Sequence, residues 1–242
     1  MKKFLALLLS ILLISFSFIA CSDSESDKSK DNKTTTNETN KTEDDTFWEV
    51  EDATLYVKGS LDSQFLNNHD NYLKLVDITI DDCNVRYKEH LQDEVNYLAN
   101  YFEIENITPE VNSSLTTLLE EIYSKSNYKV YDAKEIDENK FIVEVDINPI
   151  NIISLINTDL NTSSISFNEK YAGVDISAMT AEEYAAYDLD WANLVLNSIE
   201  ENISKIDYLD TVSLNVEVFL ADDGLYNLSD DYSNIINYII QY

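Results

Sequence analysis

The chain has 242 residues and is strongly acidic, with 46 Asp and Glu against 16 Lys and Arg and a formal net charge of −30. This balance excludes nucleic acid as a partner, because the sequence offers no basic stripe to neutralise phosphates. The 3 Gly and 2 Pro are few for this length, so we expect long uninterrupted elements, above all helices.

The first 20 residues have the pattern of a secretory signal peptide. Lys2 and Lys3 precede the apolar run 4–18, and the small residue Ala20 stands directly before Cys21. A basic start, an apolar stretch and a small residue before the cleavage point are typical of such peptides. The run is shorter than the roughly 20 residues that a membrane span needs. We therefore expect export and removal of residues 1–20, with a retained anchor as the alternative.

The residues around Cys21 resemble the lipobox of bacterial lipoproteins. Ile19, Ala20 and Cys21 fit this pattern, whereas Phe18 replaces the usual Leu. The resemblance implies that Cys21 becomes the first mature residue and carries a diacylglycerol unit and a further acyl chain such as palmitate. Two or more acyl chains give durable anchoring. The expected location is the cell membrane, facing outside the cytoplasm, and simple secretion is the alternative.

After Cys21 the composition changes twice. Residues 22–45 contain no apolar side chain, so they cannot bury a core and we expect a disordered acidic tether. Residues 46–242 are long enough for one domain with a substantial core. We expect three parts: the signal peptide 1–20, the lipidated cysteine with its tether 21–45, and a single extracytoplasmic domain 46–242.

Apolar residues recur every three or four positions in the first part of this domain, which predicts three helices. The first spans residues 52–67 and contains Gly59, which costs helix stability and could allow close packing against a neighbour. The second begins after Thr79, which forms a capping box with Asp82. The third begins at Pro109, a residue that favours the first helical position.

The apolar stripe of the second helix includes Cys83. We therefore expect a packed thiol, whose acidic neighbours raise its pKa and suppress the reactive thiolate. If Cys21 carries lipid, Cys83 has no partner within the chain, and the fold has no internal disulfide.

After the third predicted helix, the spacing of apolar residues changes from about four positions to two. Residues 128–136 and 141–147 alternate around the turn 137–140, which predicts a hairpin with one solvated face. The following segment is the least regular part of the sequence. We expect a helix at 150–160 and a long loop at 161–177.

The last part of the chain returns to helical spacing. Thr180 and Glu183 form a second capping box before a helix that extends to Ile206. Residues 212–220 alternate and predict a third strand. Ser229 is placed to cap a final helix.

This order of elements predicts an α+β domain with several helices packed on one face of a small antiparallel sheet. The layout resembles the cystatin-like and nuclear-transport-factor-like cone, in which helices pack into a curved sheet. The local sequence of residues 56–59 and 122–128 is similar to that of uncharacterised lipoproteins of Gram-positive bacteria. That resemblance carries no catalytic residue to this chain.

The sequence contains no motif for a reaction. His69 and His90 lie in different elements without the spacing that holds a metal, and we interpret both as ordinary surface residues. His90 does share a helix flank with Glu94, Tyr97 and Tyr101. We predict no catalytic residue, no cofactor-binding residue, no cofactor and no metal ligand.

Two other residue types are abundant. Asp222-Asp223 and Asp230-Asp231 lack the alternating order of a calcium loop, so we interpret them as turn and helix-start residues. The 16 tyrosines offer stacking area with a polar tip and could line a groove for a peptide or glycan. Half-buried packing at helix edges is the simpler interpretation.

We therefore expect a membrane-anchored lipoprotein that acts as a non-enzymatic binding or interaction module. Its partners would be the membrane, through the lipid, and a small ligand, peptide or envelope protein in the concavity of the sheet. One alternative is a cell-envelope hydrolase with paired carboxylates, marked by two facing acids in a cleft, one with a raised pKa. The other is a protein-interaction or immunity lipoprotein, marked by an exposed apolar patch.

Overall fold

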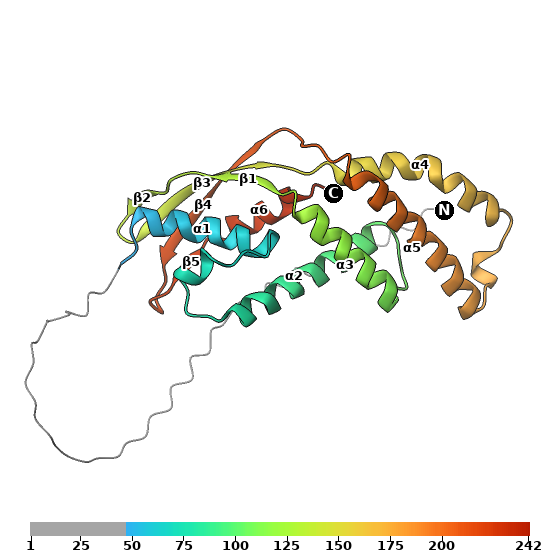
Figure 1. Cartoon of the computed structure of the whole chain (residues 1–242), viewed down its shortest axis with the longest axis horizontal. Coiled ribbons are helices and arrows are strands. Elements are labelled where there is room, and N and C mark those ends of the chain that lie inside the picture. The colour runs from blue at the N-terminus through green and yellow to red at the C-terminus, as the bar shows by residue number, and fades with distance from the viewer. Residues whose placement is uncertain (1–46) are drawn as a thin grey trace, which may run out of the picture. The chain divides into compact units, whose positions relative to one another are not determined.

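The computed structural model describes residues 47–242, which form one α+β unit (Figure 1). The predictions for the signal peptide, Cys21 and the acidic tether lie outside the described residues. No helix within 47–242 is long and apolar enough to cross a membrane. In chain order the elements are α1 Val50–Phe65, η1 Tyr72–Lys74, α2 Ile80–Tyr101, α3 Pro109–Tyr123, β1 Asn127–Val130, β2 Lys134–Asp137, β3 Lys140–Asn148, α4 Ile152–Lys170, η2 Ile176–Ala178, α5 Ala181–Ile203, β4 Val212–Leu220, β5 Tyr226–Leu228 and α6 Asp231–Ile239.

The sheet is antiparallel throughout, in the order β1-β3-β4-β5, and β2 also pairs with β3. In the central pair, Phe141 lies opposite Val218 and Val143 opposite Val216, and all four side chains are buried. Helices α1 and α6 pack against β3 and β4. The predicted fold class, with helices on one face of a small antiparallel sheet, is confirmed.

Helix starts follow the predicted capping boxes. The Asp82 amide donates to Thr79 Oγ1 at 3.1 Å, and the Thr79 amide donates to Asp82 Oδ2 at 2.9 Å. Thr180 and Glu183 make the same reciprocal pair, at 3.2 and 2.8 Å. Both pairs satisfy amide groups that the first helical turn leaves without intrahelical partners. This local chemistry explains why α2 and α5 begin where the sequence predicts.

Gly59 permits a close approach between α1 and the short helix η1. A Cβ atom at this position would lie 2.6 Å from the backbone nitrogen of Tyr72 and 3.0 Å from the carbonyl carbon of Asn71. Real side chains do not tolerate such distances to a neighbouring backbone. The absence of a side chain at Gly59 therefore lets the segment after α1 fold back onto the helix.

The prediction of a single strand at 128–136 is wrong, because the chain forms two strands there, β1 and β2. Between them, the Ala133 amide donates to Thr54 Oγ1 of α1 at 2.8 Å instead of to β3. Ala133 is also buried. This contact with α1 interrupts the ladder, and the edge of β3 is paired by two short strands.

The long loop predicted at 161–177 is largely helical, because α4 continues to Lys170. Its second half is rich in Ser, Thr and Asn, which disfavour helices in isolation. Phe167 nevertheless packs against Tyr187 and Trp191 of α5, with ring centroids 5.1 and 5.3 Å apart. Tertiary packing therefore extends the helix beyond the point where its sequence pattern ends.

Two further details near the C-terminus differ from the predictions. The three-residue strand β5 was not expected. Ser229 does not cap α6: its hydroxyl accepts a hydrogen bond from the Glu217 amide of β4 at 3.2 Å. Its own amide donates to the Glu217 carbonyl at 2.9 Å. Ser229 thus extends the pairing of β5 with β4, and α6 starts at Asp231 without a side-chain cap.

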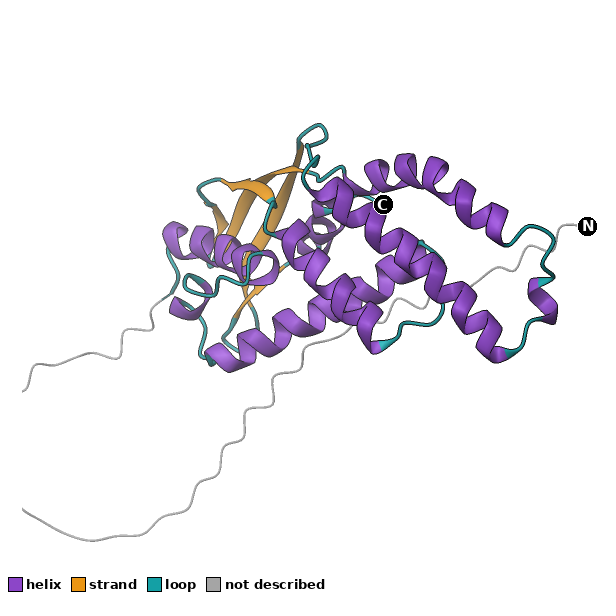
Figure 2. Ribbon diagram, turned by 45° about the vertical axis from the view of Figure 1, so that its right-hand side comes forward, coloured by secondary structure: helices purple, strands orange, loops and turns teal. Residues whose placement is uncertain are grey.

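Helices α4 and α5 form an antiparallel hairpin on the side of the unit away from the sheet (Figure 2). The buried Asp188 carboxylate of α5 accepts hydrogen bonds from the amides of Glu105 and Asn106, at 3.1 and 2.7 Å. Trp191 Nε1 donates to the Phe102 carbonyl at 2.6 Å. These bonds join α5 to the connection between α2 and α3.

Candidate functional site

The C-terminal segment of the chain is held against the end of the sheet. The Ile150 amide, just after β3, donates to the Ile239 carbonyl at 2.9 Å. Ile150 also forms a parallel bridge with Ile240. This pairing sets the course of the residues after α6, including Tyr242, which then lies beside α2.

A pocket of about 270 Å³ lies between this segment and the helices α2 and α3. Glu94 and Tyr97 of α2 line it together because residues three apart share one side of a helix. Tyr123 contributes from the end of α3, and the remaining lining comes from α6 and the residues after it. The lining residues are Glu94, Tyr97, Tyr123, Ile236, Asn237, Ile240, Gln241 and Tyr242.

Tyrosine rings form the rim of this pocket. The Tyr97 and Tyr242 rings are nearly perpendicular, at 80°, with centroids 4.5 Å apart. Tyr101 meets Tyr242 edge-on at 5.3 Å, and its hydroxyl accepts a hydrogen bond from Asn157 Nδ2 at 3.0 Å. Tyr97 is 53% exposed. The rim is therefore partly open to solvent, and several tyrosines do gather around one hollow.

Glu94 places a half-buried carboxyl group in this pocket. Burial is the largest effect on the pKa of Glu94 and raises it. Hydrogen bonds from the Tyr123 and Tyr242 hydroxyls lower this pKa and the charge of Asp93 raises it, so that the net pKa is raised. The Tyr242 hydroxyl donates to Glu94 Oε2 at 3.3 Å. Burial also raises the pKa of Tyr123 and Tyr242, so both remain hydrogen-bond donors at neutral pH.

His90 lies one helical turn before Glu94 but does not line the pocket. Its ring packs edge-on against Phe65 and tilted against Tyr123, with both centroid distances 5.5 Å. Nε2 is buried without a hydrogen-bond partner among the described residues. Burial lowers the pKa of His90 to about 4, against a small opposing effect of Asp93. His90 is therefore not the ordinary surface residue that the sequence predicted: the residue is partly exposed, but its Nε2 atom is buried.

His69 was also wrongly interpreted as a surface residue. It is buried in the turn after α1, where Nδ1 lies 2.7 Å from Ser63 Oγ and Nε2 lies 2.9 Å from Asn67 Oδ1. Both ring nitrogens are therefore satisfied within the turn. This burial was not predictable from the sequence, because it depends on the chain folding back after α1.

The face of the sheet that was expected to hold a ligand is part of the core. Phe141, Val143, Val145 and Val216 are at most 2% exposed under α1 and α6. The concavity of the sheet is thus filled by the protein's own helices. This face of the sheet therefore offers no open surface to a ligand.

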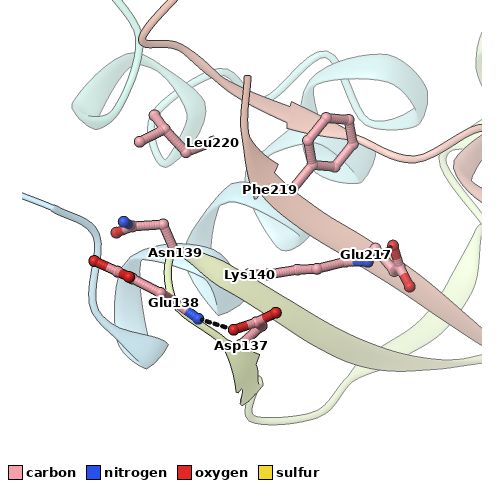
Figure 3. A pocket seen from close by; sticks show the side chains of 7 residues that line it. All are labelled: Asp137, Glu138, Asn139, Lys140, Glu217, Phe219 and Leu220. Atoms are coloured by element: carbon pink, nitrogen blue, oxygen red, sulfur yellow. Dashed lines mark hydrogen bonds and ion pairs between the residues drawn. The ribbon is translucent and has the colours of Figure 1, made fainter. Parts of the chain in front are cut away.

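A second hollow of about 370 Å³ lies at the turn between β2 and β3, next to β4 (Figure 3). Three of its lining residues are acidic, but Glu217 is paired with Lys140 Nζ at 2.8 Å. The Asp137 carboxylate accepts a hydrogen bond from the Glu138 amide at 2.8 Å, and both residues are exposed. These carboxylates serve the turn and an ion pair. The lining residues are Asp137, Glu138, Asn139, Lys140, Glu217, Phe219 and Leu220.

The remaining candidate residues have structural roles in the part of the chain described. Cys83 is 1% exposed, and burial raises the pKa of its thiol, so the prediction of a packed thiol is confirmed. Asp223 accepts a hydrogen bond from the Leu225 amide at 3.0 Å, which is turn chemistry. Within residues 47–242, no group of three or more His, Cys, Asp or Glu side chains is placed to hold a metal ion.

Comparison with known proteins identifies a fold and no family. No protein-family model matches the chain, and no curated protein matches it. The fold is similar to a crystal structure of a "putative lipoprotein (ycdA)" from Bacillus subtilis, with a TM-score of 0.52 and 14% sequence identity. The match covers 79% of this chain and 56% of that one, so it spans little more than half of the Bacillus protein. At this identity the likeness shows the fold alone, and the cystatin-like comparison stays a prediction.

Proposed function

We propose that the chain is an extracytoplasmic lipoprotein, held at the cell membrane by lipid on Cys21, that acts as a non-enzymatic binding module. The lipobox resemblance of residues 18–21 supports the anchor. The fold supports it as well, since it is similar to that of a protein described as a lipoprotein. The ligand site is the pocket around Glu94.

The observation that carries the binding role is the composition of this pocket. A half-buried carboxyl group, Glu94, lies among tyrosine rings that offer apolar faces and polar hydroxyls. Such a mixture of ring surface and convergent polar groups can hold a ligand by both stacking and hydrogen bonding. At about 270 Å³ the pocket falls just below the usual range of roughly 300–1,000 Å³, so it accepts a small group.

Binding fits this pocket better than hydrolysis. Glycosidases of the common type place two carboxyl groups about 5–10 Å apart across the scissile bond. Among the described residues that line the pocket, Glu94 alone carries a carboxylate side chain. His90, the nearest candidate base along α2, packs against Phe65 and Tyr123 and does not line the pocket. Glu94 therefore has no second group with which to share acid and base roles.

Thermal unfolding of the full chain in detergent tests this proposal. Sugars, muropeptides, short peptides and organic amines are added separately to wild type, Tyr97→Ala and Tyr131→Ala. Tyr131 is the control, because it lies at the sheet edge and bonds to Asp146. A ligand of the pocket raises the melting temperature of wild type and Tyr131→Ala but not of Tyr97→Ala. If no compound produces a shift that depends on Tyr97, the pocket is not a ligand site.

A second candidate function is protein interaction through the α4–α5 hairpin. Four apolar residues in its distal half are exposed: Ile165, Val174, Ile176 and Leu189. Exposed apolar surface of this kind is typical of protein contacts. A photo-crosslinking residue at position 176 would capture a partner in intact cells, whereas one at the exposed control position Glu200 would not. Equal crosslinking from both positions would contradict this role.

A further inference from the structure

We propose that the Glu94 pocket recognises a positively charged amine, a primary or quaternary ammonium group, with Glu94 as its counter-charge. This inference rests on the proposed function, because it names the chemical class of ligand for the same pocket. Three features of the site support it: the state of the carboxyl group, the arrangement of the rings, and the size and charge of the surroundings.

No cationic side chain among residues 47–242 forms a salt bridge with the Glu94 carboxyl group. Besides burial, three described groups shift the pKa of Glu94: the Tyr123 and Tyr242 hydroxyls and the Asp93 carboxylate. None of these groups is cationic. Two neutral donors compensate a buried negative charge only in part. A ligand that brings a positive charge would therefore gain a charge-assisted hydrogen bond or ion pair in a partly dehydrated site.

Three tyrosine rings, those of Tyr97, Tyr123 and Tyr242, line the pocket together with Glu94. The Tyr97 and Tyr242 rings contact each other edge-on, with centroids 4.5 Å apart, and Tyr101, which does not line the pocket, packs on Tyr242 at 5.3 Å. The face of a tyrosine ring is electronegative and attracts a cation within about 6 Å of its centre. Aromatic walls around an ammonium group are a common way to recognise quaternary amines. Ile236 and Ile240 add apolar surface that suits methyl groups on the nitrogen.

The size of the pocket and the charge of the protein also favour a small cationic ligand. A pocket of about 270 Å³ suits a head group or the end of a side chain and excludes a drug-sized molecule. The net charge of −30 raises the local concentration of cations and disfavours anionic ligands. A neutral sugar would use the hydroxyl groups of the site but would leave the Glu94 charge uncompensated.

Isothermal titration of the purified full chain in maltoside detergent tests the inference. The probes are choline and its neutral carbon analogue, 3,3-dimethyl-1-butanol, which differ in charge and hardly in shape. Choline is expected to bind and the alcohol to bind on the order of 10-fold more weakly or not at all. Glu94→Gln should weaken choline binding on the order of 10-fold or more. Glu89→Gln, an exposed change on the same helix, should leave it unaltered.

Further titrations distinguish the source of the amine. Ethanolamine and lysine amide represent free amines and peptide side chains, and phosphocholine represents a lipid head group whose phosphate the acidic surface should disfavour. Equal binding of choline and the alcohol, or full choline binding by Glu94→Gln, would overturn the inference. Tyr97→Ala gives an independent check, because this exposed ring can be removed without disturbing the core.

The failure of this inference can be told apart from failure of the proposed function. If a neutral compound binds with a dependence on Tyr97 while every amine fails, the ammonium inference is wrong and the pocket remains a ligand site. If no compound binds with a dependence on Tyr97, both are wrong.

Discussion

Burial disfavours the charged form of two side chains of α2, His90 and Glu94. It therefore shifts their pKa values in opposite directions. The pKa of His90 falls to about 4, below its ordinary value of 6.5, and the pKa of Glu94 rises. Between pH 6.5 and 4 the unfolded chain therefore binds a proton at His90 that the folded chain does not. Folding stability contributed by neutral His90 is present above this window and is lost as pH falls through it.

Replacing His90 with Phe should remove this acid sensitivity. The aromatic contacts with Phe65 and Tyr123 are kept, while the buried Nε2 without a described partner is eliminated. The pKa difference corresponds to roughly 3 kcal/mol at pH 4. Urea unfolding at pH 7 and pH 4 should show that His90→Phe loses about that much less stability than wild type. An equal loss in both proteins would show that His90 is not buried as a neutral ring.

Among the helices and strands, features that depend on neighbouring residues in the sequence could be predicted, whereas features that depend on tertiary contacts could not. The starts of α2 and α5 follow from Thr79 with Asp82 and from Thr180 with Glu183, because capping depends only on residues three positions apart. The second half of α4 was not predictable, because it depends on Phe167 packing against α5. Sequence alone cannot show a contact of this kind.

Gly59 provides a test at this scale, where local and tertiary effects oppose one another. Alanine is about 1 kcal/mol better than glycine in a helix interior. A Cβ at Gly59 would nevertheless lie 2.6 Å from the Tyr72 backbone nitrogen. We expect the close contact to dominate, so Gly59→Ala should lower the free energy of unfolding by about 1–3 kcal/mol in urea titrations. A gain in stability would show that α1 and η1 do not approach so closely.

The candidate site was predictable only in the part that one helix contributes. Helical spacing places Glu94, Tyr97 and Tyr101 on one flank of α2. Tyr123 and Tyr242 reach the same place from the end of α3 and from the residues after α6. No pattern in the sequence links positions so far apart. The bridge between Ile150 and Ile240, which holds the residues after α6 near α2, is likewise a contact between positions far apart in the sequence.

For the whole molecule, the proposed location at the membrane depends on a lipid on Cys21. Cys21→Ser should abolish labelling by radioactive palmitate and shift the protein from the membrane fraction to the soluble or secreted fraction. Cys83→Ala is the matched control, because Cys83 is the other cysteine of the chain and is buried. This variant should remain labelled and membrane-bound. Palmitate labelling that survives Cys21→Ser would contradict the proposed anchor.

The proposed function places the ligand of this module in the Glu94 pocket. Hydrogen–deuterium exchange of the full chain, with and without the compound that most raises the melting temperature, would locate the bound ligand. We expect slower exchange in residues 94–101 and 236–242, which surround the pocket, and no change in residues 171–180 at the end of the α4–α5 hairpin. Protection confined to 171–180, or to the turn 137–140, would place the ligand elsewhere and would show that the Glu94 pocket is not the ligand site.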